Sequence, residues 1–329
     1  MRILVTGGAG FIGSHFVKRM LAAGEDVVVL DKLTYSGNPA NLADCDVPLI
    51  EGDIADPAAV EAAATGCDAI VNFAAETHVD RSILGAAEFI QTDVLGTYVL
   101  LQQASAVGAR YVQVSTDEVY GDVEPGSSSK EDDTLIPSSP YSASKAGGDL
   151  QVLATVRTFA VNASITRGSN TYGPNQYPEK VLPLFVTNAL DGEPLPLYGD
   201  GRQVRDWLHV DDHCAAIEFV LREGAAGEIY NIGAGEEHEN VELTQRVVEY
   251  TGADPSLVRH VTDRAGHDRR YSLDVARLRS LGWRPAWRWE DGIRETVEWY
   301  RANRDWWEPI KRSGGYREYY ERQYAQRLA

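Results

Sequence analysis

The sequence is poor in cysteine, in basic residues and in long apolar runs. Its 31 Lys and Arg face 49 Asp and Glu, a net charge of −18 that lacks the basic stripe a nucleic-acid-binding protein needs. Cys45, Cys67 and Cys214 cannot pair evenly and show no ligand spacing, so we expect reduced thiols and no metal site. There is neither a membrane-spanning apolar run nor a charged-then-apolar leader, so we expect a cytoplasmic protein that does not enter membranes.

What remains is an ordinary globular composition. The 329 residues are 43% hydrophobic, enough to bury one large core or two moderate ones. We therefore expect partners to be small molecules or another subunit. In so acidic a protein, an anionic substrate has to be held by a few local cations and backbone donors.

Three glycines follow the first apolar run. Residues 2–6 read as a strand, Gly7, Gly10 and Gly13 follow it, and a helical pattern covers 14–23. Glycines at this spacing allow a tight turn, let backbone N–H groups approach a pyrophosphate, and let helix and strand pack closely. The segment predicts a dinucleotide-binding turn.

An acidic residue lies in the place where such a turn needs one. Asp31 stands 18 residues beyond Gly13, at the end of a second apolar run over 26–30. A carboxylate there accepts hydrogen bonds from ribose hydroxyls and repels a 2′-phosphate, which favours NAD over NADP. Lys32 is adjacent and weakens this preference.

Short apolar runs alternate with helical stretches over the first half of the chain. Strands are predicted at 2–6, 26–30, 48–51, 69–73, 111–115 and 163–167, and the helices between them include 86–107 and 141–160. This alternation predicts an α/β fold, a Rossmann-like doubly wound parallel sheet. Residues 52–54, 74–76 and 115–117 follow strands and should face one crevice. After Arg167 prolines interrupt the pattern, so we expect a smaller substrate-binding lobe there, while polar residues 126–133 predict an exposed loop.

The chemistry of the crevice is indicated by two segments. Residues 115–121 read Ser-Thr-Asp-Glu-Val-Tyr-Gly, and Tyr141 and Lys145 follow about twenty positions later at a spacing that shares one helix face. A Tyr-Lys pair alone is weak evidence. Beside a hydroxyl and two carboxyl groups, it predicts a site that moves both hydride and protons.

Together these motifs resemble the dTDP-glucose 4,6-dehydratase family of extended short-chain dehydrogenases/reductases. The similarity extends through residues 167–174, 178–180, 195–201, 205–210 and 263–271, and so over nearly the whole chain. It implies an NAD-binding Rossmann domain over 1–168 and a mainly nucleotide-sugar-binding domain over 169–329, with some segments returning to the first. Gly168 and Thr171 depart from the family's Cys-Ser-Asn-Asn-Tyr-Gly-Pro, whose second Asn lies by the nicotinamide.

The predicted catalytic residues are Thr116, Asp117, Glu118, Tyr141 and Lys145. Tyr141, its pKa lowered by Lys145 and the nicotinamide ring, would take the sugar 4-hydroxyl proton as NAD⁺ accepts hydride, with Thr116 bonded to the same oxygen. Glu118 would then remove the C5 proton and protonated Asp117 would assist loss of the C6 hydroxyl, because adjacent buried carboxyl groups have pKa values pushed apart.

Two further sets complete the site that the resemblance implies. The cofactor set is Gly7, Gly10, Phe11, Ile12, Gly13, Asp31, Lys32, Leu33, Thr34, Asp53, Ile54, Ala74, Ala75, Glu76, Thr92, Tyr141, Lys145 and Thr171. The substrate set is Thr77, His78, Thr116, Asn170, Lys180, Val181, Pro196, Leu197, Tyr198, Arg205, Asn240, Asp263, Arg264 and His267.

Three alternatives stay open from the sequence. A nucleotide-sugar 4-epimerase would share the fold and the Tyr-Lys pair but has no use for Asp117 and Glu118; a dehydratase could act on another nucleoside-diphosphate-glucose; and a protein could bind NAD as a sensor without turnover. A homodimer is also expected. Its interface would pair the predicted helices 86–107 and 141–160 of two subunits in a four-helix bundle, burying Phe89, Val94, Tyr98, Leu100, Leu101, Leu150, Leu153 and Val156.

Overall fold

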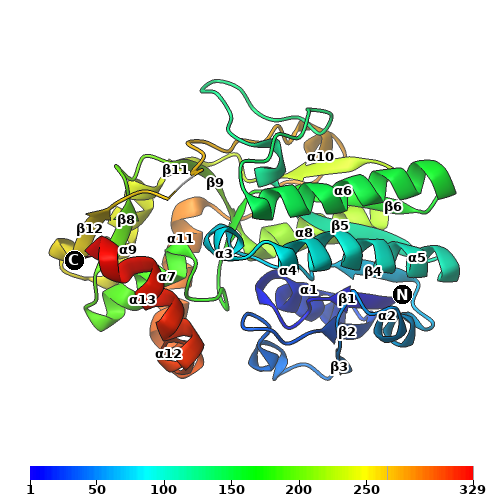
Figure 1. Ribbon diagram of the computed structural model, residues 1–329, viewed down its shortest axis with the longest axis horizontal. Coiled ribbons are helices and arrows are strands. Elements are labelled where there is room, and N and C mark those ends of the chain that lie inside the picture. Colours follow the sequence, from blue (N-terminus) through cyan, green and yellow to red (C-terminus); the bar gives the residue numbers. More distant parts are fainter. Residues whose placement is uncertain (265, 329) are drawn as a thin grey trace.

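The computed structural model describes residues 1–264 and 266–328 and is built around a seven-stranded parallel sheet (Figure 1). Across the sheet the strands follow the order β10-β6-β5-β4-β1-β2-β3. The order in which the chain adds strands reverses between β1 and β4, as expected of a doubly wound sheet. The predicted fold class is thus confirmed. The strands are β1 (Arg2–Thr6), β2 (Asp26–Asp31), β3 (Leu49–Glu51), β4 (Ala69–Asn72), β5 (Arg110–Thr116), β6 (Ala163–Gly168) and β10 (Ile229–Ile232).

Helices cover both faces of this sheet, which explains why its strands are apolar on both sides. One face packs against α1 (Phe11–Ala22), α8 (Val210–Glu223) and α10 (Ala276–Ser280). The opposite face packs against α2 (Pro57–Ala64), α5 (Thr97–Val107) and α6 (Pro140–Phe159). Both α8 and β10 follow residue 168, so the chain returns to the first sheet.

The second lobe is built from two small sheets and a group of helices, on the left in Figure 1. Its core is aromatic and includes Trp289, Tyr300 and Trp307, whereas Trp283 packs in the core of the first sheet. The elements are β7 (Asn170–Tyr172), β8 (Leu195–Tyr198), β9 (Val204–His209), β11 (Glu237–Glu239), β12 (Val258–Val261), α7 (Val181–Asp191), α9 (Asn240–Thr251), η4 (Pro255–Leu257), α11 (Trp289–Ala302), α12 (Arg304–Arg312) and α13 (Gly314–Leu328).

One hydrogen-bonded chain joins the lobes. The indole N–H of Trp306 on α12 donates to Asn41 Oδ1 over 2.9 Å, and Asn41 lies in the 3₁₀ helix η1 (Pro39–Leu42). The amide of Asn41 in turn donates to the carbonyl of Ala9 over 2.9 Å. Ala9 belongs to the glycine turn, so α12 is connected to that turn through one side chain.

The helix predicted over 86–107 is not continuous. Short helices α3 (Val79–Leu84) and α4 (Ala87–Phe89) precede a π-helical segment, η2 (Ile90–Gly96), which leads into α5. Helix α6 packs closely here: a Cβ on Gly148 would lie 2.6 Å from the carbonyl oxygen of Asp93. The wider turn of η2 brings Thr92 to the cleft and Asp93 to α6.

Two other expectations are wrong in part. The loop 126–133 is not wholly exposed, because Ser129 and Glu131 are buried. The carbonyl of Ser129 accepts from Asn231 Nδ2, and Glu131 Oε1 accepts from the Asn231 backbone N–H, 3.2 Å away.

Phe89, Leu100 and Leu101, expected on a dimer surface, are also buried. Tyr98 and Leu150 of the expected set are exposed. The other large apolar residues exposed along α3, η2, α5 and α6 are Ile83, Leu84, Ile90, Leu95, Val107 and Phe159.

A buried ion pair lies behind the carboxyl ends of β5 and β6. Arg167 Nε is 2.8 Å from Asp149 Oδ2, and both side chains are almost inaccessible to solvent. Arg167 also donates to the Tyr120 hydroxyl over 2.8 Å. This pair ties α6 to β6 and to the short 3₁₀ helix η3 (Asp117–Tyr120).

Candidate active site

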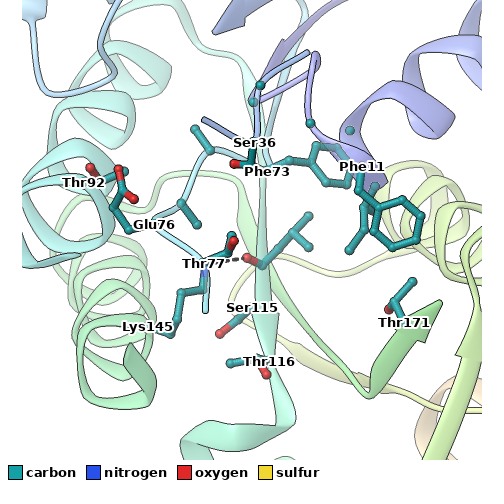
Figure 2. A pocket seen from close by; sticks show the side chains of 18 of the residues that line it. Phe11, Ser36, Phe73, Glu76, Thr77, Thr92, Ser115, Thr116, Lys145 and Thr171 are labelled. Atoms are coloured by element: carbon teal, nitrogen blue, oxygen red, sulfur yellow. Dashed lines mark hydrogen bonds between the residues drawn. The ribbon is translucent and has the colours of Figure 1, made fainter. Parts of the chain in front are cut away.

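A cleft of about 290 Å³ lies over the carboxyl ends of β1, β2, β4, β5 and β6 (Figure 2). Every predicted catalytic residue lines it, and so does every predicted cofactor residue except Leu33. The predicted substrate residues that also line it are Thr77, Thr116, Asn170 and Lys180. Gly52 and Ser115, expected to face the crevice, also line it. Residues lining the cleft that the sequence did not indicate are Leu30, Ser36, Gly37, Phe73, Val114, Gly168, Ser169, Gln176, Tyr177 and His213.

The glycine turn packs its backbone against the neighbouring strand. Gly7 has a φ of 69°, and a Cβ there would lie 2.6 Å from the backbone nitrogen of Ala74. A Cβ on Gly13 would lie 2.3 Å from the carbonyl oxygen of Gly7. Helix α1 begins at the cleft, and its first turn contains no acidic residue. This close-packed cradle fits the pyrophosphate of a dinucleotide.

Asp31 fixes the loops on either side of this cradle. Its carboxylate accepts hydrogen bonds from the backbone N–H groups of Ala9, 2.9 Å away, and Leu33, 2.8 Å away. Leu33 itself stays off the cleft. Lys32 Nζ lies 2.8 Å from Asp53 Oδ2, so its charge is already paired. The pairing removes the objection that Lys32 raised to NAD, because a free cation would be needed to attract a 2′-phosphate.

Thr116 ends β5 and caps the helix η3 that carries both carboxyl groups. Its hydroxyl accepts from the backbone N–H of Glu118 over 3.3 Å and donates to Asp117 Oδ1 over 3.1 Å. Asp117 is buried, and its Oδ2 has no hydrogen-bond partner among the described residues. The cap thus holds both carboxyl groups at one wall of the cleft.

The two carboxyl groups have different surroundings. Burial, and next the charge of Glu118, raise the pKa of Asp117 to about 8. Burial also raises the pKa of Glu118, but the cations Arg264, Arg205 and Lys180 act in the opposite direction. Asp117 is therefore suited to hold a proton at neutral pH and Glu118 to accept one, which is the asymmetry expected of an acid and a base.

Tyr141 and Lys145 lie on the first turns of α6. The helix begins with a capping box in which Ser139 and Ser142 bond each other, and Tyr141 packs edge-on against Phe89 at 6.3 Å between ring centroids. Lys145 Nζ donates to the carbonyl of Val114 over 3.0 Å.

The pKa of Tyr141 differs from the expectation. Burial, followed by the negative charges of Glu118 and Asp93, raises it well above its ordinary value. Burial and these charges outweigh the hydrogen bond with Thr116, which acts to lower the phenol pKa. A lower value requires the positive nicotinamide ring that was also part of the expectation.

Asp93 was not indicated by the sequence. It is buried on η2, accepts a hydrogen bond from Ser144 on α6, and has its pKa raised to about 6 because burial outweighs the nearby Lys145 cation. A single Asp inside a helical stretch gives no pattern to recognise, so only the π-helical turn reveals its place beside the Tyr-Lys pair.

A cationic cluster lies beyond Glu118, from the second lobe. Arg264 Nη1 is 3.3 Å from Asp80 Oδ1, and the hydroxyl of Tyr198 donates to Asp80 Oδ2 over 3.2 Å. Arg205 is buried against the ring of Tyr271, with its guanidinium carbon 4.2 Å from the ring centroid. These guanidinium groups could hold paired anionic oxygens.

The other predicted substrate residues lie around this cluster or behind it. His267 Nδ1 is 2.6 Å from Asp263 Oδ1, while His78 is buried against the ring of Tyr319. Pro196 and Leu197 are buried in β8, and Leu197 belongs to the second lobe's core. Val181 begins α7 and Asn240 begins α9; the Asn240 Oδ1 atom is buried without a described partner.

The last helix, α13, also reaches this region, which the sequence did not suggest. Gln323 Nε2 donates to Asp80 Oδ2 over 2.8 Å and to the Tyr198 hydroxyl over 2.7 Å. Tyr319 packs on the guanidinium of Arg81, 4.4 Å from ring centroid to guanidinium carbon. The sequence of α13 is rich in Tyr, Arg and Glu and is typical of a solvated helix. Its repeated tyrosines were the only signal that it reaches the site.

The described residues contain neither a candidate metal site nor a candidate membrane-spanning helix. In residues 1–264 and 266–328, no group of three or more His, Cys, Asp or Glu side chains could hold a metal ion. Within the same residues, no helix combines the length and hydropathy needed to cross a membrane.

Comparison with known proteins agrees with this geometry. The NAD dependent epimerase/dehydratase family matches residues 3–233. A dTDP-glucose 4,6-dehydratase from Streptomyces niveus is 53% identical, over 94% of this chain and 96% of that protein. The crystal structure of dTDP-glucose 4,6-dehydratase from Streptomyces venezuelae, solved with NAD bound, has a TM-score of 0.92 at 55% identity and covers 94% of this chain and 100% of its own.

A more distant enzyme shares the fold. UDP-glucose 4-epimerase from Thermus thermophilus, solved in complex with NAD, has a TM-score of 0.88 at 34% identity, over 92% of this chain and 100% of its own. The likeness thus extends to an enzyme of different activity, but the identity to the dehydratases is higher. The chain belongs to the NAD dependent epimerase/dehydratase family of extended short-chain dehydrogenases/reductases.

Proposed function

We propose that the protein converts dTDP-glucose to dTDP-4-keto-6-deoxyglucose. The observation that carries this proposal is the wall of the cleft where Asp117 and Glu118, with unlike surroundings, lie beside Tyr141 and Lys145. An oxidation at C4 needs only the Tyr-Lys pair. Two further carboxyl groups of opposite role are needed when water is to be removed across C5 and C6.

NAD held in this cleft would supply the hydride chemistry, as an acceptor for the C4 hydride of the sugar and a donor to C6. Tyr141 takes the proton of the 4-hydroxyl, and the hydroxyl of Thr116 bonds the same oxygen. Lys145 holds its charge beside the phenol and would also reach a ribose hydroxyl of the dinucleotide. The glycine turn, with Asp31 behind it, would hold the pyrophosphate and the adenine ribose.

The resulting 4-ketone acidifies the proton at C5. Glu118 takes that proton, and Asp117 gives its own proton to the departing C6 hydroxyl, which leaves as water. The proton that Glu118 gains and the one that Asp117 loses balance the elimination. As C6 is reduced, Glu118 gives its proton back to C5, which completes the 4-keto-6-deoxy product. The proton that Tyr141 took from the 4-hydroxyl equals the one that Asp117 lost, so exchange between them through solvent restores the starting state.

Recognition of the nucleotide sugar falls to the second lobe. Arg205, Arg264 and Lys180 supply the positive charge that a diphosphate requires in a protein of net charge −18. We assign the lobe from residue 169, without α8, β10 and α10, to this role. The nucleoside base is assigned from the relatives, which are dTDP-glucose enzymes.

The test is incubation of the pure protein with dTDP-, UDP-, GDP- and CDP-glucose. The 4-keto product should form fastest from dTDP-glucose, NAD should copurify, and free NADH should not accumulate because the hydride stays within one site. Formation of a 4-epimer without loss of water would favour the epimerase reading, and NADH accumulating in step with product would contradict the internal hydride return.

We further propose a cytoplasmic homodimer. The thiols of Cys67 and Cys214 are buried and unpaired, which suits a reducing compartment. Ile83, Leu84, Ile90, Leu95, Tyr98 and Leu150 are each 46–58% exposed on α3, η2, α5 and α6, which lie together in Figure 1. An apolar surface shared by adjacent helices suits a two-fold interface. Light scattering tests this: a fully active monomer of about 36 kDa would contradict it.

A further inference from the structure

Arg81, on α3, lies where the two lobes meet (Figure 1). Its Nε and Nη2 atoms donate to Glu179 Oε2 over 3.0 and 2.8 Å, and the Glu179 side chain is buried. The guanidinium packs on two aromatic rings, with its carbon 3.8 Å from the ring centroid of Tyr35 and 4.4 Å from that of Tyr319. Neither Arg81 nor Glu179 belongs to the predicted catalytic, cofactor or substrate sets.

Lys180 follows Glu179 directly in the sequence and lines the cleft. Two other lysines also line the cleft, and both are engaged: Lys32 is in an ion pair, and Lys145 donates to a backbone carbonyl. Residues 1–264 and 266–328 provide the Nζ atom of Lys180 with neither a hydrogen bond nor an ion pair. Its charge is therefore uncommitted, and it suits the diphosphate of an incoming nucleotide sugar.

Glu179 is the carboxyl group best placed to take up that charge. Burial raises the pKa of Glu179, and the cations that act against burial are Arg81 first and Lys180 next. Burial lowers the pKa of Lys180, and Glu179 is the first of the carboxyl groups that oppose this shift, ahead of Glu118. Without Arg81, the buried Glu179 carboxylate would draw Lys180 to itself as a counter-ion, because a buried charge without a partner is costly.

We propose that Arg81 is a positioning residue that keeps Lys180 free for the nucleotide sugar by serving as the counter-ion of Glu179. The inference rests on the proposed use of a nucleotide sugar. An arginine suits this position because its planar guanidinium can stack on both rings while it donates to the carboxylate, which an ammonium group cannot do. Since Tyr35 follows β2 and Tyr319 belongs to α13, segments of both lobes hold this counter-ion in place.

The first test measures the affinity of the holoenzyme for dTDP by calorimetry. Arg81→Met should weaken dTDP binding about tenfold, the usual worth of one hydrogen bond to a charged group. The double variant Arg81→Met with Glu179→Gln should recover most of the affinity, because no carboxylate is left to draw Lys180 away. With dTDP-glucose, Arg81→Met should raise KM more than it lowers kcat, since the lost charge acts on binding. Arg81→Gln, which can still donate a hydrogen bond to Glu179, should show the same loss in smaller measure.

The second test asks whether the effect passes through Lys180. Lys180→Gln should itself weaken dTDP binding about tenfold or more. In that background Arg81→Met should add less than about twofold, because the two changes remove the same contact. Arg304→Met is the matched control and should leave dTDP affinity unchanged: this guanidinium also packs on a ring, that of Trp307 at 4.8 Å, and pairs with Glu308, but it does not line the cleft.

Three outcomes would overturn the inference while leaving the proposed reaction intact: full dTDP affinity in both Arg81 variants, no recovery when Glu179→Gln is added, or an undiminished loss in the Lys180→Gln background. Absence of dTDP binding and of product formation in the unmodified protein would instead overturn the proposed function and this inference together. Melting temperatures separate lost affinity from lost folding, and Arg81→Gln carries the test if Arg81→Met does not fold.

Discussion

Asp149 and Asp117 are two buried carboxyl groups at the same end of the parallel sheet, and they differ in what surrounds them. Asp149 has the guanidinium of Arg167 at 2.8 Å. Asp117 has another carboxyl group as its neighbour, a hydroxyl as its one hydrogen-bond partner, and a pKa raised to about 8. Burial raises the pKa of Asp149 as well, but the Arg167 cation opposes that shift, so this first arrangement suits a carboxylate that keeps its charge. The second suits a group that must hold and release a proton, so the partner, more than the burial, separates structural from catalytic carboxyl groups.

The largest effect is expected at the catalytic pair. Glu118→Gln should lower turnover about a hundredfold to ten-thousandfold, the usual contribution of a general base, while the melting temperature stays the same or rises. Turnover is followed by the 4-keto product. Glu124→Gln, on an exposed loop residue, is the control and should be unchanged. Full turnover in Glu118→Gln, with the C5 hydrogen still exchanging for deuterium, would show that the base is another group.

The oxidation step can be separated from the elimination. Tyr141→Phe removes the base for the 4-hydroxyl, so in single-turnover experiments the appearance of enzyme-bound NADH should slow about a hundredfold or more. Glu118→Gln should still form that NADH. Equal rates of NADH formation in Tyr141→Phe and the unmodified protein would remove the role assigned to the phenol.

At the buried ion pair of Arg167 and Asp149, we expect substitutions to affect stability. Arg167→Met leaves Asp149 buried without its cation and should cost about 3–5 kcal/mol of unfolding free energy in urea. Replacing both residues, as Arg167→Met with Asp149→Leu, should restore much of that stability because no charge is left buried. A loss below about 1 kcal/mol in the single variant would mean that Asp149 is neutral in the folded protein.

Asp117 predicts a pH dependence of known sign. Because its folded pKa, about 8, lies above its unfolded value, the native state holds a proton that the unfolded state has lost between about pH 4 and pH 8. Its contribution to stability is therefore greatest at low pH and falls as pH rises through that window. Turnover should fall up to tenfold per pH unit above about 8. In Asp117→Asn, whose overall rate is low, the slope of stability against pH should flatten, and an unchanged slope would refute the assignment.

The smallest effect is expected at an exposed pair in the same cleft. Lys32 and Asp53 lie 2.8 Å apart, but the lysine side chain is 52% exposed. Such pairs contribute about 0–1 kcal/mol, so Lys32→Ala should change NAD⁺ affinity less than about fivefold in a binding titration. A larger loss would mean that Lys32 contacts the dinucleotide directly.

The sequence predicted the sheet well because parallel strands buried on both faces leave continuous apolar runs. The ends of those runs also located Asp31, Asp53 and Thr116, since ligands bind at the carboxyl ends of such strands. The acid/base asymmetry of Asp117 and Glu118 was predictable as a tendency, but its cause was not: Arg205 and Arg264 come from distant segments.

The features that the sequence missed depend on contacts between distant segments. The π-helical turn at Asp93 contains no proline, and its single glycine, Gly96, does not distinguish it from an ordinary helix. Glu131 reads as a loop residue until Asn231, a hundred positions later, binds it. His213 would be read as an ordinary core histidine, and only the folded chain shows that it contacts Thr171 and lines the cleft. Single residues whose surroundings come from distant segments leave no periodic pattern.

The Trp306–Asn41–Ala9 hydrogen bonds have a mechanical consequence. If the two lobes separate to admit a nucleotide sugar, they must either break the indole–amide bond or rotate about it as a pivot. The pivot adjoins the glycine turn, so opening on the opposite side would have to break the contacts of Arg264, Tyr198 and Gln323 with Asp80. A sugar could then exchange while the dinucleotide stays gripped, which is the order of events that a recycled cofactor requires.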